Sequence, residues 1–268
     1  MSDLIVEKSG PVTTLIRTRE HARNAMDPAG AQALYEALLA FDRDDEARVA
    51  VIWGAGGAFC AGFDLKVAAA AATDASEPFG DDLDIPREGL WPRGPMGPTR
   101  LMLSKPVIAA ISGPAVAGGM EIALWCDLRV MEEDAFMGVY CRRWGVPLID
   151  GGTVRLPRLV GMGRAMDLIL TGRKVEADEA LRIGLADRVV PHGTSREAAE
   201  ALARDIARFP QGCMKADRRS AYEQWDLSLE EALRNEWQTS SRMAIDEGIA
   251  GAARFAAGKG RGGDFGAI

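Results

Sequence analysis

The apolar positions in the first part of the chain fall into short runs that are typical of β-strands. Residues 4–6 and 12–16 flank a Ser-Gly-Pro turn at 9–11, which predicts two opening strands. Two later runs, 49–53 and 107–111, are almost continuously apolar, as expected for strands buried on both faces of a sheet.

Helical spacing lies between the second and third of these strands. Leu34, Leu38 and Phe41 recur at helical intervals, and Asp27 followed by Pro28 supplies an N-cap and a first helical residue. Alternation of strand, helix and strand predicts parallel strands joined by helical crossovers.

The remaining chain divides into one irregular stretch and one helical region. Residues 73–99 are dense in Pro, Gly and Asp and too long for an ordinary connection, so we interpret them as a mobile loop or lid. From residue 154 onward the pattern is mostly helical. No internal repeat occurs, and no linker separates independent domains.

Composition predicts a soluble globular protein. Its 268 residues, 47% of them hydrophobic, suffice for one large core. Neither a long apolar run nor a basic start followed by an apolar stretch is present, which argues against a transmembrane helix or a signal peptide and makes the cytoplasm the expected location. The net charge of −7 gives no general attraction for nucleic acid or anionic membrane.

Cysteine and histidine restrict the possible chemistry. The four cysteines form no C-x-x-C pair, so we expect core thiols, not a disulfide framework or a structural zinc site. His21 and His192 are the only histidines, which leaves few arrangements for Ser-His or Cys-His nucleophilic catalysis.

Two glycine-rich stretches, 53–65 and 117–119, each follow an expected strand and precede an expected helix. Glycine lets backbone approach a ligand closely, and the first helical turn offers N–H groups without intrahelical partners. Two such turns side by side would point two donors at one oxygen, although tight strand-to-helix packing is an alternative. A dinucleotide fingerprint beginning at Gly54 meets Phe59 where its third glycine belongs, and the Gly-Lys-Ser/Thr of a phosphate loop is missing.

Three segments in order, GAFCAGFDL, KPVIAAISGPAVAGGMEIALWCDLRV and GVPLIDGGTVRLPRLVGMGRAMDLIL, resemble the enoyl-CoA hydratase/isomerase (crotonase) family. The resemblance covers nearly the whole chain and rests most on A-G-x-D, G-G-x-E and G-G-T. It implies an α/β crotonase (ClpP/crotonase-like) fold of repeated ββα units, with a core at 1–195 and a C-terminal helical trimerisation region at 196–268 within the same structural unit. It also implies an acyl-CoA substrate and a homotrimer or hexamer.

The same resemblance assigns an oxyanion hole to the backbone N–H groups of Phe63 and Gly118, where they would stabilise the enolate-like oxygen of a thioester. Glu121 matches the glutamate of G-G-x-E, one of two acid/base carboxylates in the family's hydratases. Its position near a helix N-terminus among apolar neighbours independently suggests burial and a raised pKa, although a glutamate of the N-cap region without a catalytic role is the alternative.

The second hydratase glutamate is replaced in this chain. Its expected position holds Cys141, which cannot serve as a carboxylate, and this departure puts two-glutamate hydration in doubt. Asp150 stands where naphthoyl-CoA synthases and chlorobenzoyl-CoA dehalogenases of the family have a catalytic aspartate. We therefore expect Asp150 to partner Glu121 as an acid, a base or a nucleophile, with a turn aspartate that caps the next helix as the alternative.

Coenzyme A would enter as part of the thioester substrate, with no separate cofactor and no metal. By resemblance, the residues that bind it are Arg23, Ala25, Ala61, Asp64, Leu65 and Lys66. Arg23 and Lys66 would meet the phosphates, as would Lys259 and Arg261 of a neighbouring subunit, although each alone can equally be a solvated surface charge.

The expected activity is that of an enoyl-CoA hydratase. An isomerase with one carboxylate as a proton shuttle is the alternative enzyme, and a non-catalytic acyl-CoA-binding homologue is the alternative outside enzymes. Dehalogenation is disfavoured because neither His21 nor His192 lies in the matching region, and a peptidase centred on Ser112 lacks a nearby histidine.

Overall fold

The main sheet combines the two opening strands with the buried runs. The computed structural model describes residues 3–73, 83–89 and 91–260. Within these residues, six strands form one sheet in the order β1-β2-β3-β4-β6-β9, with β1 antiparallel to β2 and all other neighbours parallel. The strands are β1 (Leu4–Ser9), β2 (Val12–Arg17), β3 (Val49–Gly54), β4 (Val107–Ile111), β6 (Leu128–Glu132) and β9 (Arg188–Val190).

Helix α1 (Pro28–Arg43) is the crossover between β2 and β3. It begins as its sequence predicts, because Oδ1 of Asp27 accepts a 2.7 Å hydrogen bond from the N–H of Gly30. Leu34, Leu38 and Phe41 are buried in the core with residues of the sheet, so the expected parallel crossover is confirmed.

The first turns of α7 (Ser195–Ala207) contact the main sheet through side chains of its second and third strands. The hydroxyl of Thr14 donates a 2.9 Å hydrogen bond to Oε1 of Glu200, and the guanidinium of Arg196 lies 5.4 Å from the ring centroid of Trp53. Helix α7 therefore covers the face of the sheet opposite to α1. Burial on both faces explains why the central strands β3 and β4 are apolar.

A second, smaller sheet positions the glycine turns. Within the described residues it has the order β5-β7-β8, formed by β5 (Pro114–Val116), β7 (Phe136–Gly138) and β8 (Val175–Glu176). The chain passes from β4 of the main sheet to β5 and then into α3 (Gly118–Trp125), and it passes likewise from β6 to β7. The unit of two strands followed by a helix therefore recurs.

The chain divides into two compact units, residues 1–203 and 204–268. The first also contains α2 (Leu65–Thr73), α4 (Gly152–Val160), α5 (Met162–Thr171), α6 (Ala177–Arg182) and the 3₁₀ turns η1 (Glu20–Ala22), η3 (Pro98–Arg100) and η4 (Tyr140–Trp144). The helical character expected after residue 154 is confirmed. No helix in the described part of the chain is long and apolar enough to cross a membrane.

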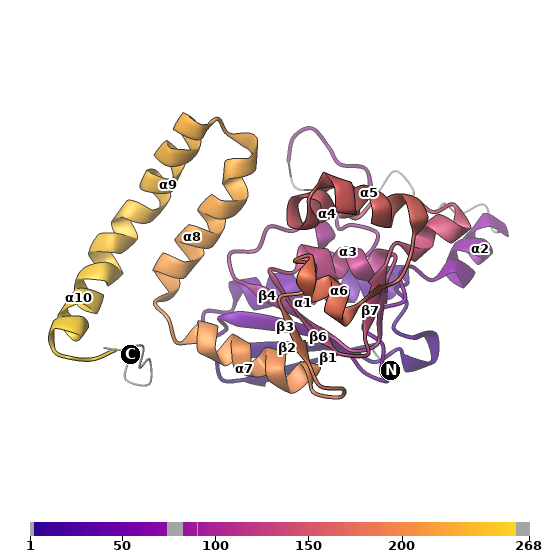
Figure 1. The fold of residues 1–268 in the computed structure, drawn as a ribbon, viewed down its shortest axis with the longest axis horizontal. Helices are drawn as coiled ribbons and strands as arrows, with labels where there is room; N and C mark the ends of the chain where they lie inside the picture. Colours follow the sequence, from indigo (N-terminus) through magenta and orange to yellow (C-terminus); the bar gives the residue numbers. More distant parts are fainter. Residues whose placement is uncertain (1–2, 74–82, 90, 261–268) are drawn as a thin grey trace. The chain divides into compact units, whose positions relative to one another are not determined.

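The second unit is a helical hairpin (orange to yellow in Figure 1). Ser228 caps its second helix and forms a capping box with Glu231. The carboxylate of Glu247 accepts the N–H groups of Gly212 and Cys213 and so ties the end of the hairpin to its beginning. Its elements are α8 (Gln211–Glu223), η5 (Gln224–Asp226), α9 (Leu229–Met243), the π-helical turn η6 (Ala244–Gly248) and α10 (Ile249–Ala256).

Candidate functional site

The two glycine turns lie side by side. Cys60 forms a parallel bridge with Ala115 of β5, with N–H to O distances of 3.1 Å from Cys60 to Pro114 and 3.0 Å from Val116 to Cys60. This pairing brings the turn that holds Phe63 next to the turn that holds Gly118. The adjacency on which the oxyanion-hole expectation depends is therefore present.

Glycine at the start of α3 is required by close packing. A Cβ at Gly119 would lie 2.2 Å from the carbonyl oxygen of Cys60, and one at Gly118 would lie 2.5 Å from Sδ of Met96. Ala117 precedes them with φ 53°, a conformation that glycine adopts more readily than alanine. As the first residue of α3, Gly118 has an N–H without an intrahelical partner, and no other described residue accepts it.

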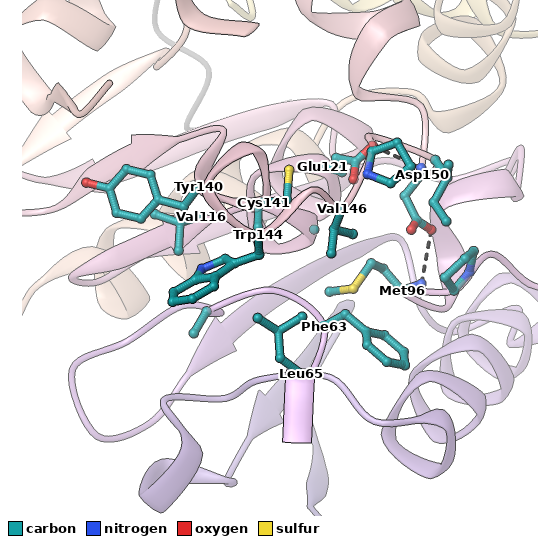
Figure 2. Close-up of a pocket in the computed structure, with 16 residues that line it drawn as sticks. Phe63, Leu65, Met96, Val116, Glu121, Tyr140, Cys141, Trp144, Val146 and Asp150 are labelled. Atoms are coloured by element: carbon teal, nitrogen blue, oxygen red, sulfur yellow. Dashed lines mark hydrogen bonds between the residues drawn. The ribbon is translucent and has the colours of Figure 1, made fainter. Parts of the chain in front are cut away.

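An apolar pocket is lined in part by residues of both glycine turns, Phe63 and Gly118. Its volume is about 150 Å³, the size of cavity that holds a benzene-sized group. Figure 2 shows Glu121 and Asp150 together at one part of the wall and Trp144 at another. Further residues that line it include Leu65, Met96, Tyr140, Cys141 and Val146. The pocket is therefore small and mainly apolar, with two carboxyl groups in its wall.

Glu121 is a buried carboxyl group held by backbone donors. Its side chain belongs to the first turn of α3 and is only 3% exposed. Oε1 accepts hydrogen bonds from the N–H of Asp150 at 2.9 Å and of Gly152 at 2.8 Å. Burial, reinforced by the charge of Asp150, raises the pKa of Glu121 from 4.5 to about 7. Such a group holds and releases protons near neutrality.

Asp150 is likewise buried, and its side chain does not cap the next helix. Gly151 is the N-cap of α4, which has no side-chain cap. Oδ1 of Asp150 instead accepts a 3.0 Å hydrogen bond from the N–H of Met96 and a second from the hydroxyl of Thr99. Burial raises the pKa of Asp150 above its usual range, whereas the two hydrogen bonds act in the opposite direction. The structure therefore disagrees with a simple capping role.

Cys141 also reaches the pocket. It lies in η4 and is 7% exposed. Burial, together with the nearby charge of Glu121, raises the pKa of its thiol, so the thiol stays neutral at physiological pH.

The residues expected to bind coenzyme A come from two segments, 23–25 and 61–66, which lie side by side as one strip. The carbonyl oxygen of Arg23 accepts the N–H of Ala61 at 3.0 Å, and that of Met26 accepts the N–H of Asp64 at 2.8 Å. Ala61 and Leu65 also line the pocket. Hydrogen bonds therefore hold the two segments side by side next to the pocket.

Side chains of this strip differ in their surroundings. Arg23 and Lys66 are exposed, and Ala25 is buried. The carboxylate of Asp64 is engaged within the protein, by Arg19 at 2.6 Å and by the N–H of Lys66 at 2.9 Å. Asp64 therefore stabilises the turn, and Arg23 and Lys66 are the exposed charged side chains of the strip. Of the two tail residues, Lys259 belongs to the second unit and Arg261 lies outside the described residues.

Histidine takes no part in the pocket among the described residues. Nδ1 of His192 lies 2.8 Å from a carboxylate oxygen of Asp134, on an exposed surface. Ser112 directs its hydroxyl to the carbonyl oxygen of Gly54 at 3.3 Å. Neither His192 nor Ser112 therefore lines the pocket.

Sequence reasoning missed the residues that fix Asp150. Met96 and Thr99 belong to the stretch interpreted as a loop or lid, whose residues 74–82 and 90 lie outside the described part. Arg155, in α4, donates to the carbonyl oxygens of Thr99 at 2.7 Å and Asp150 at 3.0 Å. No motif marks these residues, since the contacts join parts of the chain distant in sequence.

Comparison with known proteins agrees with this geometry. Residues 8–256 match the family described as enoyl-CoA hydratase/isomerase. The enoyl-CoA hydratase EchA19 of Mycobacterium tuberculosis is 34% identical over 91% of this chain and 90% of its own length. A carnitinyl-CoA dehydratase of Salmonella arizonae is 34% identical over 86% and 84%, respectively. A crystal structure of an enoyl-CoA hydratase from M. tuberculosis superposes with a TM-score of 0.85 at 31% identity, covering 96% of each chain. The expected crotonase fold is confirmed.

Proposed function

This chain belongs to the enoyl-CoA hydratase/isomerase family, and on that premise we propose that it catalyses the reversible addition of water to an enoyl-CoA thioester. One observation carries the proposal. Glu121 and Asp150, two buried carboxyl groups joined through a backbone hydrogen bond, line the same apolar pocket as Phe63 and Gly118. That set provides a proton donor, a proton acceptor and two backbone amides around one small volume.

The backbone of Phe63 and Gly118 would bind the thioester oxygen. When water attacks the β-carbon, negative charge develops on this oxygen, and preorganised N–H donors stabilise it most in the transition state. The N–H of Gly118 supports this role, because no described residue accepts it and Gly118 lines the pocket.

The two carboxyl groups would move the protons. One takes a proton from the water whose oxygen bonds to the β-carbon, and the other gives a proton to the α-carbon, so that one water is added in total. The two groups then exchange a proton through bound water or solvent to restore the starting state. Dehydration is the same sequence in reverse, which fits the name of the dehydratase relative.

Cys141 would line the pocket without taking part in proton transfer. A neutral thiol with a raised pKa is a poor base and a poor acid near neutrality. The same replacement supports the second candidate, an isomerase in which one carboxyl group moves a proton from one carbon to another. A non-catalytic acyl-CoA-binding protein is the third.

Assembly and location belong to the same proposal. We place the enzyme in the cytoplasm as a homotrimer or a hexamer, assembled through the C-terminal helical region at 196–268. Exposed apolar side chains on α9 and α10, such as Leu233, Trp237 and Ile249, support association of the second unit with another surface. Coenzyme A would lie along the strip at Arg23 and Lys66.

Turnover of a panel of enoyl-CoA thioesters, followed by mass spectrometry, tests the proposal. A product heavier by one water supports hydration, with Asp150→Asn as the inactive control. A product of unchanged mass but shifted double bond identifies the isomerase. If calorimetry shows that an enoyl-CoA thioester binds but none is turned over, the chain is a non-catalytic acyl-CoA-binding protein. That result overturns the proposal.

A further inference from the structure

One short segment supplies both donors to the carboxylate of Asp150. Gly94 and Gly97 close a tight turn through reciprocal N–H to O hydrogen bonds of 2.9 Å, and η3 follows directly. The turn presents the N–H of Met96, and η3 presents the hydroxyl of Thr99, both to Oδ1. Thr99 is only 2% exposed, so water does not compete for this hydrogen bond.

The surroundings hold this arrangement in place. The guanidinium of Arg155 bonds the carbonyl oxygens of both Thr99 and Asp150 and thereby ties the two backbones together. A Cβ at Gly94 would lie 2.2 Å from Oγ1 of Thr99 and 2.5 Å from Oδ1 of Asp150. The turn is therefore shaped to leave room for this hydrogen bond.

The other carboxylate oxygen has a different environment. Among the described residues, no donor bonds Oδ2 of Asp150, although Asp150 lines the pocket. Fixing Oδ1 also fixes the plane of the carboxyl group, so Oδ2 keeps one direction. A freely rotating carboxyl group would lose the alignment on which proton transfer depends.

We propose that Thr99 is a positioning residue for Asp150, whose hydroxyl holds Oδ1 so that Oδ2 faces the bound acyl group. This rests on the proposed acid/base function of Asp150. The charged and titratable groups around Asp150 are Glu121 from α3, Arg155 from α4, Arg100 from the end of η3, and the thiol of Cys60. A hydroxyl donor stabilises the ionised carboxylate, so its loss raises the pKa of Asp150.

Three variants isolate this hydroxyl. Thr99→Val replaces it with a methyl group of similar size, and Thr99→Ser retains it. Thr14→Val is the matched control, because Thr14 is a buried threonine whose hydroxyl bonds the carboxylate of Glu200 at 2.9 Å, away from the pocket. Should the valine variant fail to fold, Thr99→Ala removes the same hydroxyl with less bulk.

The pH profile of turnover is the first measurement. Thr99→Val lowers kcat about tenfold with little change in KM, and it moves the limb controlled by Asp150 about one pH unit higher. The direction is the same whether Asp150 acts as acid or base. Thr99→Ser and Thr14→Val keep the wild-type profile. A Thr99→Val profile that coincides with wild type, beside an inactive Asp150→Asn, overturns the role of Thr99 and leaves the proposed function standing.

Titration of Asp150 itself gives a readout that needs no activity. Protein labelled with ¹³C at aspartate carboxyl carbons yields a signal assigned by its loss in Asp150→Asn. Its midpoint moves upward in Thr99→Val and stays in place in Thr99→Ser. An unmoved midpoint in Thr99→Val overturns the proposal. If wild type turns over no enoyl-CoA, the proposed function fails and the positioning role fails with it, even where the midpoint moves.

Discussion

The backbone N–H of Asp150 donates a 2.9 Å hydrogen bond to Oε1 of Glu121, so one carboxyl residue directly anchors the other. The N–H of Gly152 adds a second donor to the same oxygen. A shift of the turn that contains Asp150 would therefore disturb both acids together. Their mutual repulsion, together with burial, places Glu121 where it can exchange protons near neutral pH.

Removal of either carboxyl group should abolish most turnover. Glu121→Gln and Asp150→Asn are each expected to lower kcat at least about a hundredfold, the low end for a general acid or base. Cys141→Ala serves as the control and should change kcat only slightly. Steady-state kinetics on the thioester that wild type uses best measures all three. Full activity of Asp150→Asn with loss in Cys141→Ala would show that the thiol belongs to the acid/base pair.

The N–H of Gly118 can be isolated by comparing two substitutions. Gly118→Ala and Gly118→Pro both add a Cβ that must displace Sδ of Met96, but only proline removes the N–H. Proline is tolerated as the first residue of a helix. We expect kcat of Gly118→Pro to be about a hundredfold or more below that of Gly118→Ala, with similar affinity for coenzyme A. Circular dichroism checks folding, and equal rates in the two variants would remove this N–H from the oxyanion hole.

Stability should depend on pH through Glu121. Its folded pKa of about 7 exceeds the ordinary 4.5, so folding favours the protonated form. The resulting stability is fully present below pH 4.5 and is lost as the pH rises through about 7, a change of about 3 kcal/mol. Urea unfolding of wild type and Glu121→Gln at pH 5 and pH 8 measures it. The advantage of glutamine over glutamate should grow with pH, and a constant difference would contradict the raised pKa.

Backbone strain before α3 predicts opposite effects at two neighbouring positions. Ala117→Gly relieves the positive φ of 53° and should stabilise the protein by about 1 kcal/mol after the entropy cost of glycine. Gly119→Ala should destabilise it, because the new Cβ would lie 2.2 Å from the carbonyl oxygen of Cys60. Thermal unfolding compares them. A lower Tm for Ala117→Gly would mean that the alanine side chain contributes more than the strain costs.

Binding of coenzyme A should weaken with salt in spite of the protein's negative net charge. Arg23 and Lys66 are exposed beside the strip that would bind it, and interactions of exposed charges are screened by salt. Lys66→Ala is expected to lower the affinity and to reduce its salt dependence, whereas Lys8→Ala, which removes a lysine paired with Asp44, should not. Calorimetry at two ionic strengths decides, and salt-independent binding would argue against phosphate recognition here.

The sequence by itself determined the strands, the crossover helix and the two glycine turns. Asp27 and Pro28 mark the start of α1 through local chemistry, and the apolar runs at 49–53 and 107–111 require burial on both faces. Local rules suffice for these elements because the hydrogen bonds and apolar periodicity that define them lie within a few residues of each other. Glu121 was likewise recognisable from its motif.

Only the tertiary structure decided which groups surround the acids. The donors to Asp150 come from Met96 and Thr99, which lie 54 and 51 residues away along the chain. Their stretch of Pro, Gly and Asp has no periodicity from which a position could be inferred. Contacts of this kind depend on how separate elements pack, and burial then sets the pKa values of both carboxyl groups. The paired acids are therefore a property of the folded chain, because desolvation and long-range hydrogen bonds exist only after packing.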